Sequence, residues 1–129
     1  MGNAWRRHLD YFLTGMRAHR GDPAWFESEW PQIERAWKAG QELGDATTLL
    51  VYLNAALPLM APLGLWTTAI AWITLGLPWV QQAGNKLGEG VLLENLGYSH
   101  FLLGNREKAL AIYEQALAQI GRASCRERV

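Results

Sequence analysis

The chain has 129 residues, of which 50% are hydrophobic and 19% are charged, and its 12 Lys and Arg residues equal its 12 Asp and Glu residues. This length suits one small domain, and the apolar fraction excludes a disordered chain. The balanced charge excludes a global field that would draw the chain to nucleic acid or to an anionic surface, so nucleic acid is not expected as a partner.

Two features of the sequence indicate the cellular compartment of the protein. Cys125 is the single cysteine, so no internal disulfide can form, which agrees with a reducing compartment. The first residues, MGNAWRRHLDYF, carry charges where a signal peptide needs an apolar run. We therefore expect a cytoplasmic protein.

Helical periodicity begins near the N-terminus, and no segment alternates as a half-buried strand does. A helix over residues 4–20 places one apolar stripe at Trp5, Leu9, Phe12, Leu13 and Met16. Gly21 ends it, and Asp22 with Pro23 forms an N-cap and first-turn pair for a second helix that reaches Leu43. Pro31 is expected to kink or split that helix, and Gly44 with Asp45 to separate it from the next.

Two apolar helices are predicted next, over residues 46–60 and 65–83, with the breaker cluster APLG between them. Pro58 and Pro78 are expected to end these helices early. No charged residue lies between Asp45 and Lys86, so an alternative interpretation is a membrane hairpin with two crossings of roughly twenty residues each. The short first arm, which contains Asn54 and Pro58, favours a soluble core that the flanking amphipathic helices bury.

Residues 90–119 carry the most specific pattern, GVLLENLGYSHFLLGNREKALAIYEQALAQ, which resembles a tetratricopeptide repeat (TPR). The matching positions, which we predict to pack the two helices together, are Leu93, Leu96, Gly97, Gly104, Ala109, Tyr113 and Ala116. Gly97 and Ala109 are small enough to let two antiparallel helices approach, and the space around them is expected to be filled by Leu93, Leu96, Leu110, Tyr113 and Leu117. Gly104 would end the first helix and Asn105 would cap the second, while His100 stands where the repeat usually has an aromatic residue.

One such hairpin cannot bury its own face, so further repeats are expected upstream. Aligning Gly64 with Gly104 sets Ala69 against Ala109, which suggests a degenerate repeat over residues 46–83, and residues 4–43 would form a more divergent helical pair. The predicted fold of residues 1–119 is therefore all-α, a right-handed stack of antiparallel helical hairpins with about six helices, like a TPR α-solenoid.

The order of these parts is similar to the helical sensor arm of bacterial signal-transduction ATPases and transcriptional activators. The similarity runs through RHLDYFLTGM, WFESEWPQIERAWKAGQELGD, the apolar hairpin and the repeat. It implies a fragment of a larger signalling regulator. The chain has no G-x-x-x-x-G-K-[ST] loop, so any ATPase activity would belong to another part of the parent protein.

Catalysis is not expected. His8, His19 and His100 fall at no ligand spacing with cysteine or carboxylates, and no serine lies in a G-x-S-x-G setting, so neither a metal nor a cofactor is predicted. His8 and His19 are interpreted as solvated residues and His100 as a packing residue. The basic patch is interpreted as a solvated helix face and consists of Arg6, Arg7, His8, Arg17 and Arg20.

The predicted function is non-catalytic binding of a protein or peptide. By the resemblance, the first helix of the repeat lines a groove at Val91, Glu94, Asn95, Tyr98, Phe101 and Leu102. Tyr98 and Phe101 would supply contact area, and Asn95 would bond a peptide backbone. In an equally weighted alternative, Phe101 and Leu102 face a further repeat of the parent protein, and an uncovered face would favour self-association.

The last ten residues, IGRASCRERV, fit the preceding helical pattern poorly. They resemble the translation of a sequencing-adapter oligonucleotide, so residues 120–129 are predicted to be a non-native tail, with a natural basic tail as the alternative. No function is therefore assigned to Cys125.

Overall fold

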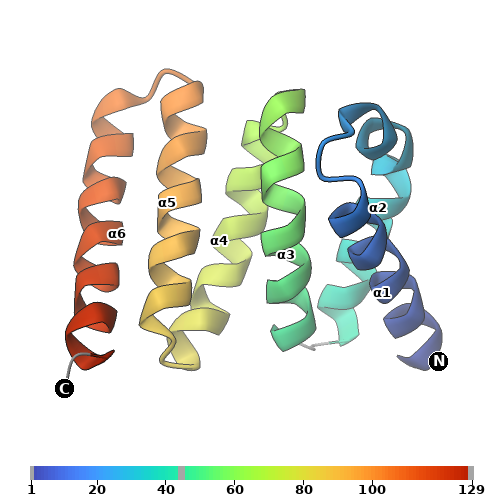
Figure 1. Cartoon of the computed structure of the whole chain (residues 1–129), viewed down its shortest axis with the longest axis horizontal. Coiled ribbons are helices and arrows are strands. Elements are labelled where there is room, and N and C mark those ends of the chain that lie inside the picture. The colour runs from blue at the N-terminus through green and yellow to red at the C-terminus, as the bar shows by residue number, and fades with distance from the viewer. Residues whose placement is uncertain (1, 44–45, 128–129) are drawn as a thin grey trace. The chain divides into compact units, whose positions relative to one another are not determined.

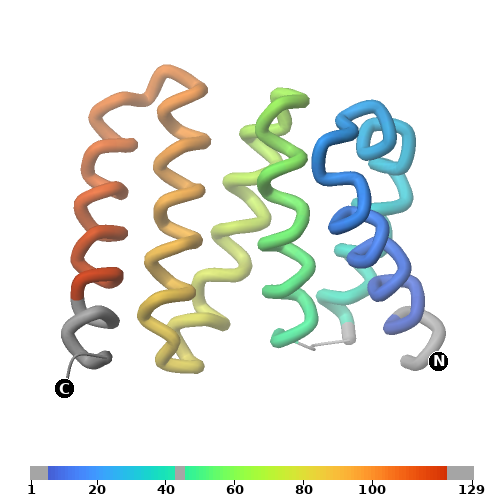
Figure 2. Tube along the Cα trace, in the orientation of Figure 1, coloured from blue at the N-terminus to red at the C-terminus, as the bar shows by residue number. Residues whose placement is uncertain are grey.

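Helices make up the structure, a computed structural model that describes the backbone of residues 2–43 and 46–127 and the side chains of residues 6–42 and 46–121 (Figures 1 and 2). These residues form six α-helices, one short 3-10 helix and no strand, so the predicted all-α class is confirmed. The α-helices are α1 (Gly2–Ala18), α2 (Pro23–Leu43), α3 (Ala46–Met60), α4 (Trp66–Gln82), α5 (Lys86–Leu102) and α6 (Arg106–Glu127), and the 3-10 helix η1 (Ala61–Leu63) follows α3. The chain divides into two compact units, Met1–Gly64 and Leu65–Val129.

The first unit packs α1, α2 and α3 around one apolar core. The predicted stripe of α1 faces inward, since Leu9, Phe12 and Met16 are buried, whereas Trp5 lies outside the described side chains. Asp22 caps α2 as predicted, because its Oδ1 accepts a hydrogen bond from the Trp25 backbone N–H (3.1 Å). Periodicity therefore predicted the inner face of α1.

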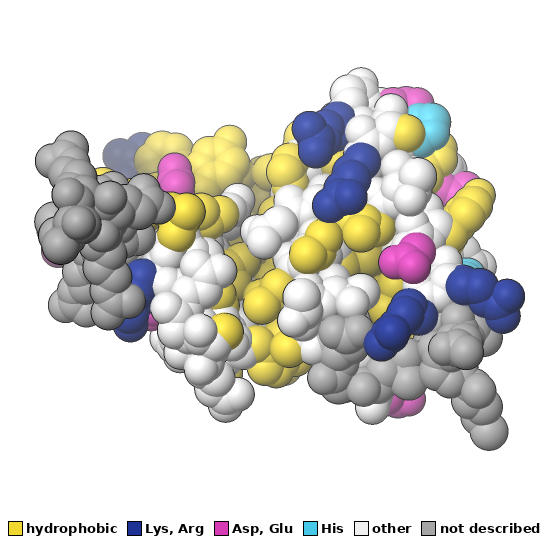
Figure 3. All heavy atoms as spheres, turned by 60° about the horizontal axis from the view of Figure 1, so that its bottom comes forward, with side chains coloured by type: hydrophobic (Ala, Val, Ile, Leu, Met, Phe, Trp, Pro, Cys, Tyr) yellow, Lys and Arg dark blue, Asp and Glu magenta, His cyan; other side chains and the backbone are white. Residues whose placement is uncertain are grey.

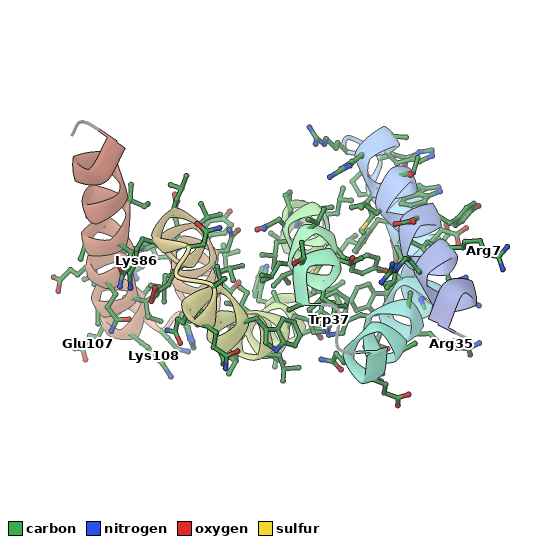
Figure 4. All side chains as sticks on the ribbon, turned by 90° about the horizontal axis from the view of Figure 1, so that it is seen from below. Arg7, Arg35, Trp37, Lys86, Glu107 and Lys108 are labelled. Atoms are coloured by element: carbon green, nitrogen blue, oxygen red, sulfur yellow. The ribbon has the colours of Figure 1, made fainter. Side chains whose placement is uncertain are left out.

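The uncharged helix α3 supplies much of this core. Its buried residues are Leu49, Tyr52, Leu53, Ala56, Leu57, Leu59 and Met60. Tyr52 donates a hydrogen bond from its hydroxyl to the backbone oxygen of Ile33 (2.8 Å), which satisfies the one polar atom of that side chain. Burial also raises the pKa of the Tyr52 hydroxyl well above its ordinary value. Trp37 points from α2 toward α3 and stacks on the Tyr52 ring (Figure 4).

The helices continue through their prolines, so the predicted split at Pro31 and the predicted early ends at Pro58 and Pro78 were wrong, whereas a kink at Pro31 stays a prediction. Helix α2 continues through Pro31, α3 continues through Pro58 to Met60, and α4 continues through Pro78 to Gln82. Each proline removes one backbone donor, and all three residues are exposed, so packing of the buried faces on either side maintains the helices. The predicted separators Gly44 and Asp45 lie outside the described residues.

The second unit packs α4, α5 and α6, with α5 between the other two (Figure 1). Helix α4 ends at Gln82 and is followed by Gly84, whose φ is 69° and whose N–H donates to the Gln81 backbone oxygen (3.0 Å). Asn85 then caps α5, since its Oδ1 accepts from the Gly88 N–H (2.9 Å). Because of this cap, α5 begins at Lys86, one turn before the predicted start of the repeat at Gly90.

The C-terminal helix α6 does not end at Gln119, the predicted end of the repeat, but continues to Glu127. Ile120 is half-buried, and its Cγ1 lies 2.6 Å from the position that a Cβ would take at Gly90. Residue 120 therefore belongs to the packed hairpin. That residues 120–129 are non-native stays a prediction, and the side chain of Cys125 lies outside the described ones.

The predicted repeat over residues 46–83 falls in both compact units, because α3 belongs to the first and α4 to the second. Stacking of the hairpins into a solenoid therefore stays a prediction. Among the described residues, one helical stretch, Ala46–Leu63, is long and apolar enough to cross a membrane, with a mean hydropathy of 1.5. The same test is passed by core helices of soluble proteins, so the membrane alternative also stays a prediction.

Candidate functional site

The turn between α5 and α6 sets the geometry of the candidate site. Gly104 has a φ of 89°, and its N–H donates to the Phe101 backbone oxygen (3.0 Å), while the Asn105 N–H donates to the His100 backbone oxygen (2.9 Å). This pair of bonds is a Schellman motif, which requires the left-handed conformation that glycine adopts without strain. Gly104 therefore ends α5 as predicted, and Phe101 and Arg106 lie on opposite sides of the turn.

Small residues let α5 and α6 approach closely, as the repeat pattern predicts. A Cβ at Gly97 would lie 3.0 Å from two ring carbons of Tyr113, so the aromatic ring packs directly on the Gly97 backbone. Ala109 and Ala116 are both buried. A second close approach, which the sequence analysis missed, occurs at Gly90, where a Cβ would lie 3.3 Å from the backbone oxygen of Ala116.

Two of the residues predicted to fill the hairpin core point outward instead. Leu110 is 63% exposed and Leu117 is 69% exposed. The core consists of Leu93, Ile112 and Ala116, with Leu77 and Leu96 packed against it. Ile112, rather than Leu110 or Leu117, lies in this core because Ala109, Ile112 and Ala116 share the face of α6 that meets α5.

The six predicted groove residues divide into two groups. Glu94, Tyr98 and Phe101 are exposed on α5, whereas Val91, Asn95 and Leu102 are half-buried. Asn95 donates from Nδ2 to the backbone oxygen of Val91 (2.9 Å), so part of its hydrogen-bonding capacity is used within α5. Tyr98 and Phe101 are therefore the most accessible contact residues of the predicted groove.

The exposed residues of both helices surround one apolar cleft. Its volume is about 430 Å³, and it is lined by Phe101, Arg106, Ala109, Leu110 and Tyr113. Burial raises the pKa of the Tyr113 hydroxyl, and the charges of Glu94 and Tyr98 raise it further. We call the surface formed by Tyr98, Phe101, Leu110, Tyr113 and Leu117 the α5–α6 face.

Three members of this face, Leu110, Tyr113 and Leu117, were assigned to the hairpin core rather than to a site by the sequence analysis. Their spacing of three and four residues did mark an apolar stripe on α6. Arg106 was missed altogether, because a single cation at a helix start carries no pattern of its own. The chain folding back at Gly104 brings this stripe beside Tyr98 and Phe101.

A buried carboxylate joins the three helices of the second unit. Glu89 is 6% exposed, and its Oε1 accepts hydrogen bonds from Nε2 of Gln81 on α4 (3.2 Å) and from Nε2 of Gln119 on α6 (3.4 Å). Lys86 lies 3.8 Å from the other carboxylate oxygen and balances its charge. Through these contacts Glu89 links α5 to α4 and α6, so we interpret the cluster as a structural one that holds the three helices in register.

Polar residues of the first unit line open hollows among the described side chains. His19, predicted to be solvated, is half-buried because its ring stacks on Trp25 with centroids 4.4 Å apart, and these two residues line a hollow of about 390 Å³ with Asp10 and Tyr11. His8 is also half-buried, since its ring packs edge-on against Phe12. The described part of the chain contains no group of three or more His, Cys, Asp or Glu residues that could hold a metal ion.

The basic patch of α1 is spread over an exposed surface. Arg6, Arg7, Arg17 and Arg20 are exposed, and Arg7 points away from the unit (Figure 4). In the space-filling view, the basic side chains on the side that holds α1 and α2 have acidic and apolar ones among them (Figure 3). Arg17 and Arg20 line a hollow of about 240 Å³ with Val51, Asn54 and Ala55. This arrangement agrees with a solvated helix face.

The stability of the second unit is expected to fall as the pH falls below about 6.5, the ordinary pKa of histidine. His100 is buried, and Asn105 Nδ2 lies 3.3 Å from its Nδ1, which accepts this bond in the neutral ring. Burial, and then the charge of Lys108, lower the pKa of His100. Above pH 6.5 the neutral His100 ring contributes its full stabilising effect to the folded state. Below pH 6.5 the unfolded chain binds a proton at His100 before the folded chain does, so this stabilisation decreases until the pH reaches the lower pKa of the folded state.

Thermal unfolding followed by circular dichroism at about pH 7 and about pH 5 measures this loss. The variant His100→Gln has no imidazole at this position, so its melting temperature should fall less between the two pH values. Equal losses in the two proteins would show that another group causes the pH dependence.

No protein-family model, curated protein or solved structure matches the chain. The likeness to tetratricopeptide repeats and to sensor arms therefore stays a prediction from residue patterns. The function of the α5–α6 hairpin is inferred from its own contacts and its exposed side chains.

Proposed function

We propose that this chain is a non-catalytic helical scaffold that binds a protein or peptide through the α5–α6 face. The observation that carries the proposal is the exposure of four large apolar side chains on this face, two of which, Phe101 and Leu110, line the cleft. Tyr98 is 46% exposed, Phe101 50%, Leu110 63% and Leu117 69%. A soluble chain gains by covering such a surface, because each large apolar side chain is worth about 1.5–3 kcal/mol when fully buried.

The shape of this surface favours a helical or extended peptide. Side chains from two antiparallel helices line the cleft, and its rim carries Arg106 beside the apolar residues. An amphipathic segment can insert one or two apolar side chains between such helices while its polar side stays in water. The neighbouring Tyr98 and Phe101 are aromatic residues of the kind that dominate binding energy in protein interfaces.

The resemblance to a sensor arm suggests the cellular role of this binding. In that setting the chain is part of a larger cytoplasmic signalling or transcriptional regulator, and the α5–α6 face receives a partner protein or a further repeat of the parent. The scaffold itself performs no chemistry, and no metal or cofactor takes part.

Selection from a phage-displayed peptide library tests the proposal. The chain should select peptides with spaced apolar residues, and Leu110→Asp should abolish their binding by placing a charge at the cleft. The matched control is Leu75→Asp on α4, since Leu75 is similarly exposed at 47% but does not line the cleft. The proposal fails if both variants bind the selected peptides as well as the original chain does.

A membrane protein is the second candidate function, and the apolar stretch Ala46–Leu63 favours it. In this case the chain would fractionate with membranes and resist extraction by carbonate and by salt. Soluble helical material after ultracentrifugation without detergent would exclude this candidate.

A further inference from the structure

The α5–α6 face carries opposite charges toward its two ends. Arg106 lines the cleft beside the Gly104 turn and makes no ion pair with a described residue. Glu94 is exposed on α5, roughly two turns before the end of that helix and one turn from Tyr98 on the same helical face. The surface between them is apolar and exposed. Glu107 and Lys108, next to Arg106, are also exposed and balance each other's charge.

A surface with this order of charges is complementary to itself. In a dimer with twofold symmetry the same patch meets its copy, and when the axis runs across the helices the residues at one end of the patch meet those at the other end. When two α5–α6 faces meet in antiparallel orientation, Arg106 of each copy comes opposite Glu94 of the other, and the apolar residues cover each other. The formal net charge of zero leaves no overall repulsion between the copies.

We propose that the α5–α6 face binds a second copy of this chain in an antiparallel dimer with twofold symmetry, in which Arg106 pairs with Glu94 of the other copy. The inference rests on the proposed function, since it names the partner of the same face. Parallel pairing would bring the two Arg106 ends together and the two Glu94 ends together, so like charges would lie near one another. The charges therefore select the antiparallel orientation as well as the partner.

Sedimentation velocity over a hundredfold range of concentration tests the inference on the full chain. The original chain should shift from monomer to dimer as the concentration rises. Arg106→Glu and Glu94→Arg should each weaken dimerisation by about tenfold or more, because each places like charges opposite one another. The double variant, with both substitutions, should restore dimerisation because it reverses the pair without changing its complementarity.

Three outcomes would overturn the inference. These are a chain that stays monomeric over the whole range, a double variant that dimerises no better than the single variants, and a dimer that persists in Leu110→Asp. Circular dichroism establishes that each variant is helical, and Leu75→Asp should dimerise as the original chain does. A monomeric chain that still selects peptides through the cleft would refute the dimer and leave the proposed function standing.

Discussion

Replacing Trp37 by alanine is expected to destabilise the first unit by about 3–5 kcal/mol. The side chain is 1% exposed, and its ring stacks on that of Tyr52 with centroids 6.3 Å apart and an interplanar angle of 23°. Removing the indole leaves a cavity between α2 and α3 that rigid helices fill only in part. Urea denaturation followed by circular dichroism would measure the change in the free energy of unfolding.

The matched control for this prediction is Tyr52→Phe, which changes the same cluster without opening a cavity. It removes only the hydroxyl that donates to the Ile33 backbone oxygen, so we expect a loss of about 1 kcal/mol. If Trp37→Ala were no more destabilising than Tyr52→Phe, the stacked ring pair would not be a main contribution to the core.

Replacing Gly90 by leucine is expected to destabilise the second unit by about 3 kcal/mol. A Cβ at this position would lie 2.6 Å from Cγ1 of Ile120 and 3.3 Å from the backbone oxygen of Ala116. The side chain of Ile120 can move, but the Ala116 oxygen belongs to the backbone of α6, so the leucine must force α5 and α6 apart. The same denaturation experiment measures the effect.

Gly121→Leu is the control, because it introduces the same side chain into the same hairpin at an open position. No atom lies within 4 Å of a Cβ at Gly121, and leucine favours a helix more than glycine does, so stability should stay equal or rise by about 0.5–1 kcal/mol. Equal effects of the two leucines would contradict the close approach at Gly90 and the packing of Ile120 against it.

Local sequence signals predicted the helices and several of their ends correctly. Asp22 caps α2 and Gly104 ends α5, because an N-cap bond and a left-handed residue each depend on a few neighbouring atoms. The predicted split at Pro31 was wrong for the opposite reason. Pro31 weakens its own helical turn, but the buried residues on both sides of it, such as Phe26 and Ile33, hold α2 together through contacts that no local pattern reports.

The candidate site was only half predictable, because α6 has two apolar stripes with the same spacing. Ala109, Ile112 and Ala116 form one, and Leu110, Tyr113 and Leu117 form the other, each at intervals of three and four residues. Periodicity cannot say which stripe faces the core. The glycines of α5 decide it, since Gly90 admits close contact with the Ala116 backbone and Gly97 admits the Tyr113 ring, while Leu110 and Leu117 face solvent.

The sequence by itself determined that this chain is helical and where most helices begin and end, because these properties follow from local hydrogen bonds and helical spacing. The resemblance to a repeat, and not the spacing, predicted Tyr98 and Phe101 as contact residues. The tertiary structure decided which stripe of α6 is exposed, how Arg106 and Leu110 join Phe101 around one cleft, and that Glu89 is buried between Gln81 and Gln119. Those properties depend on how closely neighbouring helices approach, and that distance is set by residues far apart in the chain.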